Sequence, residues 1–133
     1  MPDRVFFACG ACHILAYAFL AKYPDRGFGA LWIKPANGFT GNHIVVVSGD
    51  TAFDYHGYAS WRALLAHTHA TANRWWPGWS AEIVPLPADV LISGPKSRTY
   101  DGLWLREPQE YLHDAMPRAE RFLDRFGDPP TPV

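Results

Sequence analysis

The chain has 133 residues, of which 48% are hydrophobic and 15% aromatic, and its formal net charge at pH 7 is -1. This length and composition predict one globular domain with an ordinary core and exclude a disordered chain. The sequence holds no run of lysine or arginine. We therefore expect neither nucleic acid nor a membrane as the partner.

The apolar stretches are short. The longest, Ile14 to Ala21, falls well below the roughly 18 apolar residues of a membrane span. Met1 to Ala8 lacks the pattern of a cleaved signal peptide, and two cysteines three positions apart cannot form a disulfide framework. We expect a cytoplasmic protein, or one secreted without a cleaved signal. A single domain is predicted over residues 1–128, with a loose tail over 129–133.

The first half of the chain predicts a buried helix followed by antiparallel strands. Residues 4–8 predict a short strand and Cys9-Gly10-Ala11 a turn. Residues 12–22 predict a helix that is apolar on all sides and therefore buried, ended by Pro24 to Gly27. A strand is predicted over 28–34, a turn over 35–38, and a hairpin of strands 43–48 and 51–55 around Gly49-Asp50.

The second half predicts more helix. Ser60 is a suitable N-cap for a helix over 61–70. A strand is predicted over 79–86, short strands or irregular chain over 90–92 and 102–105, a helix over 108–115, and, after Pro117, a further helix over 118–126. The predicted fold class is α+β, with the N-terminal helix buried against an antiparallel sheet.

Cys12 lies where a turn becomes a helix. Free amide groups and the helix dipole give that position a partial positive charge, which favours the nucleophilic thiolate. Cys9-Gly10-Ala11-Cys12 resembles the signature of papain-like proteases, in which the second cysteine attacks. The chain departs from it at His13, where that family has Trp or Tyr, and at Phe6, where it has an oxyanion glutamine. The Cys12 amide is one oxyanion donor and the second is open, with Asn42 and His56 as supporting candidates.

The predicted hairpin places a base and its partner on one face. With Gly49-Asp50 as the turn, Val45 opposes Asp54 and His43 opposes His56, so all four side chains share a face. His43 and Asp54 are then diagonal neighbours within reach of a hydrogen bond. The order Cys12, His43, Asp54 resembles that of transglutaminase-like and arylamine-acetyltransferase-like enzymes, over roughly the first 60 residues.

The resemblance implies a papain-like/transglutaminase-like core and a cysteine enzyme. Cys12 would attack a peptide or small amide substrate, His43 would serve as base and then acid, and Asp54 would orient the imidazole. Hydrolysis, deamidation and acyl transfer stay open. Trp75, Trp76 and Trp79 are candidate substrate contacts.

Other readings of the same residues remain. Cys9-x-x-Cys12 also resembles a thioredoxin- or glutaredoxin-like redox site, and Cys9 to His13 matches a c-type haem attachment string, although only eight residues precede it. A non-catalytic binding module with the same fold is a further alternative. We expect no metal and no cofactor, because His67 and His69 point apart on a helix.

Overall fold

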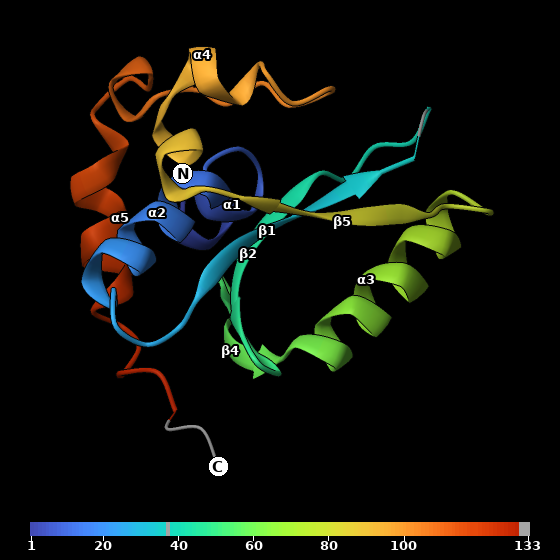
Figure 1. Cartoon of the computed structure of the whole chain (residues 1–133), viewed down its shortest axis with the longest axis horizontal. Coiled ribbons are helices and arrows are strands. Elements are labelled where there is room, and N and C mark those ends of the chain that lie inside the picture. The colour runs from blue at the N-terminus through green and yellow to red at the C-terminus, as the bar shows by residue number, and fades with distance from the viewer. Residues whose placement is uncertain (37, 131–133) are drawn as a thin grey trace.

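The computed structural model describes residues 1–36 and 38–130. Its centre is a five-stranded sheet in which every neighbouring pair of strands is antiparallel, in the order β4-β3-β2-β1-β5 (Figure 1). The strands are β1 (Gly29–Pro35), β2 (His43–Ser48), β3 (Thr51–Asp54), β4 (Gly57–Ser60) and β5 (Ala81–Leu86). The α+β class expected from the sequence is confirmed at this level.

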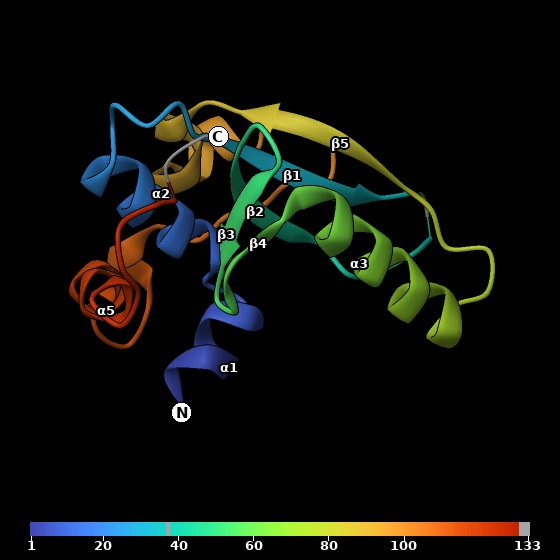
Figure 2. The ribbon, with the colours of Figure 1, turned by 90° about the horizontal axis from the view of Figure 1, so that it is seen from below.

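Helices cover both faces of the sheet. The α-helices are α1 (Asp3–Ala8), α2 (Cys12–Lys22), α3 (Trp61–Trp75), α4 (Gly94–Ser97) and α5 (Ala115–Leu123), and two 3-10 turns span Ala88–Ile92 and Pro108–Glu110. Helices α2 and α5 lie on one side of the sheet and α3 on the other (Figure 2). One core therefore forms around α2, and a smaller one forms under α3.

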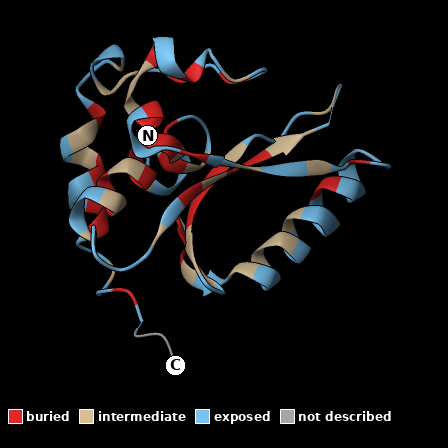
Figure 3. Cartoon of the chain, in the orientation of Figure 1, coloured by how far each residue is buried: buried red, intermediate tan, exposed pale blue. Residues whose placement is uncertain are grey.

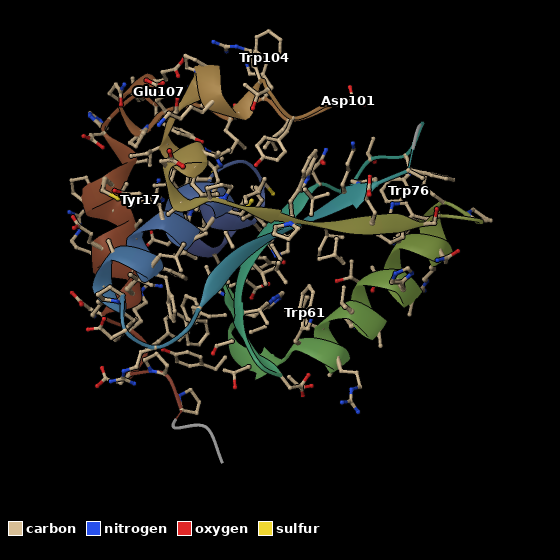
Figure 4. The ribbon with its side chains drawn as sticks, viewed as in Figure 1. Tyr17, Trp61, Trp76, Asp101, Trp104 and Glu107 are labelled. Atoms are coloured by element: carbon tan, nitrogen blue, oxygen red, sulfur yellow. The ribbon has the colours of Figure 1, made fainter. Side chains whose placement is uncertain are left out.

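The two cores use alternate residues of the same strands. Ile44, Val46 and Phe53 pack with α2, whereas Val45 and Ala52 pack with the α3 side. Alternation of this kind follows from the two-residue period of a strand. Figure 3 shows the buried residues concentrated along α2 and the central strands, while α3 is mostly exposed or half-buried. Trp61 lies between α3 and the sheet (Figure 4).

Helix α2 and strand β2, which carry Cys12 and His43, have the predicted bounds. Helix α2 runs from Cys12 to Lys22, and its side chains are buried on several sides, as an apolar helix requires. In the hairpin, Ser48 pairs with Thr51 and Val46 with Phe53, which is the predicted register. Gly49 has a φ of 59°, which suits glycine in so short a turn.

The end of that hairpin differs from the prediction. Strand β3 ends at Asp54, and the chain turns through Tyr55 and His56 into β4, which the sequence analysis missed. His56 is therefore a turn residue and does not pair with His43 across a strand. The turn forms because Gly57 adopts a φ of 102° and the His56 amide donates to the Asp54 carboxylate.

Residues 4–8 are helical, so the predicted strand there is wrong. Asp3 begins α1, and its carboxylate accepts from Arg118 at 2.6 Å and from Arg125 at 2.8 Å. Both arginines belong to the C-terminal part of the chain. A short segment with apolar residues thus becomes a helix whose first turn is held by a distant element.

The predicted helices over 108–115 and 118–126 are also corrected. A capping box between Glu107 and Glu110 closes a single 3-10 turn, and Tyr111 is extended. Helix α5 then begins at Ala115, with Asp114 as its N-cap. Pro117 lies in the first turn, where its missing amide hydrogen is not needed, so it does not end or kink the helix.

The last third holds further differences. Residues 88–92 form a 3-10 turn where a short strand or irregular chain was predicted over 90–92, and 94–97 form the short α4. Residues 102–105 are irregular, which is one of the two predicted alternatives. Pro129, which we expected in a loose tail, is buried, and its carbonyl accepts from Arg26 at 3.3 Å. Residues 131–133 and Asn37 of the predicted turn lie outside the described residues. Within residues 1–36 and 38–130, no helix is long and apolar enough to cross a membrane.

Candidate active site

Cys12 is the first residue of α2 and is half-buried. The N-cap residue, Ala11, provides no side-chain acceptor, and its carbonyl receives the amides of Ile14 and Leu15. The amides of Cys12 and His13 have no intrahelical partner, as at the start of any α-helix. The sulfur therefore sits at the positive end of a helix, which favours its anionic form.

His43 is held by a buried carboxylate. It is the first residue of β2, and its Nε2 donates to Asp54 Oδ2 at 2.9 Å. Asp54 is 6% exposed, and its other oxygen accepts from the amide of His56 at 2.9 Å. Burial alone would raise the pKa of Asp54, but the bond from His43 and the charge of that ring lower it. Asp54 is therefore ionised, and it leaves Nδ1 of His43 for a second partner.

Cys12 lines the same hollow as His43 and interacts with its ring. Burial alone would raise the pKa of Cys12, but hydrogen bonds with the side chains of His13 and His43 lower it to about 6. Burial would lower the pKa of His43, whereas its bonds with Asp54 and Cys12 raise it to about 10. At a pH between these two pKa values, Cys12 is a thiolate and His43 is an imidazolium. This is the activated state of a cysteine nucleophile.

His13 is the residue of this site that sequence reasoning missed. Its ring is 3% exposed, and Nε2 donates to the carbonyl of Arg106 at 2.8 Å. Tyr111 also reaches this corner, where its hydroxyl donates to the carbonyl of Gly10 at 2.6 Å. The sequence presents His13 as a departure from the papain-like signature and as part of a haem attachment string, without a role beside the nucleophile. Its position directly after the cysteine was the one available signal that it could touch the sulfur.

Asn42 and His56 lie on either side of this centre. The side-chain oxygen of Asn42 accepts from Trp32 Nε1 at 2.8 Å, which leaves the amide NH2 as its free donor. Asn42 lines the same hollow as Cys12. His56 is exposed, and its Nδ1 lies 3.5 Å from Asp54 Oδ1. Asn42 can thus offer a donor to the hollow that Cys12 lines, whereas His56 supports the carboxylate through its amide.

The three tryptophans do not form one platform. Trp75 and Trp76 are exposed, at 69% and 43%, and Trp76 lies near the ends of β1 and β5 (Figure 4). Trp79 is buried, and its indole donates to the carbonyl of Thr40 at 2.9 Å. Of the three, Trp79 shares a hollow with His43. Trp75 and Trp76 lie apart from Trp79 because α3 continues through Trp75, so these two residues lie beyond the sheet.

Two hollows meet at His43. The nucleophile hollow, about 460 Å³, is lined by Cys12, His13, Trp32, Asn42, His43 and Leu103 among others. The α3 hollow, about 380 Å³, is lined by His43, Tyr55, His56, Leu64, Thr71 and Trp79 among others. Each volume lies in the usual range of small-ligand sites, roughly 300–1000 Å³.

Comparisons of the chain with protein-family models, curated proteins and solved structures found no match. The chemistry of the site therefore has to be argued from its own geometry. Within residues 1–36 and 38–130, no three His, Cys, Asp or Glu side chains are arranged to hold a metal ion. The groups present can bear a thiolate, transfer a proton through His43 and offer amide donors to a developing oxyanion.

Proposed function

We propose that this protein is a cysteine-nucleophile enzyme that acts on an amide or related acyl bond through a thioester intermediate. The observation that carries the proposal is the position of His43, which donates from Nε2 to the buried Asp54 and lines one hollow with Cys12, whose pKa it lowers. Such an arrangement, a nucleophile, a base and a group that orients the base, recurs on unrelated folds. The resemblance to papain-like and transglutaminase-like enzymes supports it.

The proposed reaction begins with attack of the Cys12 thiolate on the carbonyl carbon. A C–S bond forms, the carbonyl electrons move to oxygen, and that oxyanion accepts from the Cys12 amide and the Asn42 NH2. When the C–N bond breaks, the leaving nitrogen takes the proton of the His43 imidazolium. The neutral ring then removes a proton from water or another nucleophile, which attacks the thioester and releases Cys12.

Thiol–disulfide exchange is the second candidate, because Cys9 and Cys12 line the same hollow and Cys9 is exposed. A thioredoxin-like site requires a strand before the first cysteine. Here the segment before Cys9 is helix α1. The arrangement around His43 also has no role in that chemistry, so we favour the acyl reaction.

The direct test is the pH dependence of Cys12 alkylation by iodoacetamide, measured by mass spectrometry in a Cys9→Ser background. The rate should rise through about pH 6, where Cys12 loses its proton, and then level off. His43→Ala removes both a hydrogen bond to the thiolate and the positive charge of the neighbouring imidazolium. It should move that inflection toward roughly 8.5 and slow alkylation at pH 7 by about two- to threefold, because the smaller thiolate fraction is partly offset by the greater nucleophilicity of the more basic sulfur.

Two results decide between the candidates. An unshifted inflection in His43→Ala would contradict the role of His43 as the base, and with it the proposed function. A protein that reduces disulfides, and loses that activity in Cys9→Ser while Cys12 alkylation is unchanged, would favour the redox reading.

A further inference from the structure

The α3 hollow has no part in holding the nucleophile, although it opens on the proposed catalytic histidine. It lies between one face of α3, from Leu64 to Ala72, and the start of β2 and end of β3, and it shares Ala8, Gly41, Asn42 and His43 with the nucleophile hollow. Cys12 lines the nucleophile hollow and is not among the residues of the α3 hollow. His43 therefore stands between two spaces of similar size, and only one of them contains the sulfur.

Because the sulfur lies in only one hollow, each half of a substrate can be assigned to one of the two hollows. After attack, the acyl group is bonded to the sulfur, so it occupies the nucleophile hollow. The leaving group accepts its proton from His43, which borders both spaces, and it departs on the side away from the sulfur. That side is the α3 hollow, whose walls combine apolar Leu64 and Trp79 with polar His56, His67 and Thr71.

We propose that the substrate is a secondary amide, of the peptide or isopeptide class, whose amine portion binds in the α3 hollow before it leaves. This inference rests on the proposed function and narrows it. A primary amide releases ammonia, which needs none of the roughly 380 Å³ on that side. An apolar wall and nearby polar groups are the usual features of a site that recognises an organic substituent.

The test compares methyl vinyl sulfone with phenyl vinyl sulfone on the full chain carrying Cys9→Ser. Both reagents alkylate any accessible thiolate, and they differ in the group that can fill a hollow. The readout is the ratio of phenyl to methyl rates at Cys12, divided by the same ratio for glutathione. This normalised ratio cancels the intrinsic reactivity of each reagent and of the sulfur.

Helix α3 provides a matched pair of variants. Thr71 is exposed and lines the α3 hollow, so Thr71→Trp should fill it. Ala70, its neighbour, is exposed and outside the lining, so Ala70→Trp adds the same bulk on another face of the helix. We expect a normalised ratio of about ten or more in the parent and in Ala70→Trp, and a value near one in Thr71→Trp.

A normalised ratio near one in the parent would overturn the inference, and so would an equal loss in the two tryptophan variants. Failure of the proposed function has a different signature, namely an unshifted alkylation inflection in His43→Ala. Cys12 could pass that first test while its vinyl sulfone ratio stays near one. In that case the enzyme assignment would stand and the secondary-amide substrate would be withdrawn.

Discussion

Cys9 and Cys12 are separated by two residues, yet their surroundings differ. Cys9 caps the end of α1 and is exposed, whereas Cys12 opens α2 beside two imidazoles. The interval between a pKa of about 6 for Cys12 and about 10 for His43 is the range in which their ion pair persists. Asp54 contributes to the upper limit because its bond stabilises the charged imidazole.

Replacing Asp54 tests that contribution. In Asp54→Asn, the loss of the carboxylate should lower the pKa of His43 from about 10 and allow the ring to adopt the wrong tautomer. Any acyl-transfer rate should fall by roughly 10²- to 10⁴-fold. The measurements are the NMR titration of the His43 ring and the rate on a thioester or amide substrate.

Asp50→Asn is the control, because Asp50 is bonded to Ser60 and Arg62 at the other end of the hairpin. A His43 titration that is the same in both variants would contradict the role given to Asp54.

At the scale of elements, the turn between β3 and β4 positions the carboxylate. Asp54 ends β3, the His56 amide binds it, and Gly57 begins β4 with a φ of 102°. A Cβ added to Gly57 would lie 2.9 Å from Cε1 of Phe126. The turn is therefore constrained by its own backbone and by a ring from the C-terminal part of the chain.

Gly57→Ala should consequently cost more stability than Gly49→Ala. Both glycines have positive φ, but a Cβ on Gly49 meets nothing within 4 Å. We expect a loss of about 1–2 kcal/mol for Gly49→Ala from backbone strain alone. For Gly57→Ala we expect a loss of about 1–3 kcal/mol from backbone strain, and a further loss from the close contact with Phe126. Urea unfolding of the two variants measures the difference, and equal losses would show that Phe126 gives way freely.

At the scale of the molecule, the site depends on contacts between the two ends of the chain. Phe7 of α1 lies 5.0 Å, centroid to centroid, from Phe122 of α5, and both rings are buried. The Tyr58 hydroxyl donates to the carbonyl of Gly127 at 2.8 Å, which joins β4 to the segment after α5. Helix α5 thus packs against both α1 and α2.

Phe122→Ala should therefore destabilise the whole domain. Removing a buried phenylalanine costs about 3–5 kcal/mol, a large part of the 5–15 kcal/mol that is typical of a domain. Thermal or urea unfolding should show this loss, with the Cys12 alkylation inflection unchanged in the folded fraction. Leu112→Ala is the control, because Leu112 is 94% exposed and its loss should cost less than about 0.5 kcal/mol. Similar values for the two variants would contradict the packing role of Phe122.

The sequence alone determined the elements that depend on local rules. Helix α2 has its predicted bounds because an apolar run lies between a turn and Pro24, and the hairpin register follows from a two-residue turn and strand alternation. The proximity of His43 to Asp54 came from the same register. These features depend only on residues that are adjacent along the chain or that face each other across a hairpin.

Only the tertiary structure decided the rest. The approach of Cys12 to His43, the burial of His13 against Arg106 and the helical state of α1 each depend on residues far away in sequence. The α3 hollow likewise exists because α3 packs on one end of the sheet. The physical reason is that a local pattern fixes backbone geometry, whereas the approach of two side chains depends on how separate elements share one core.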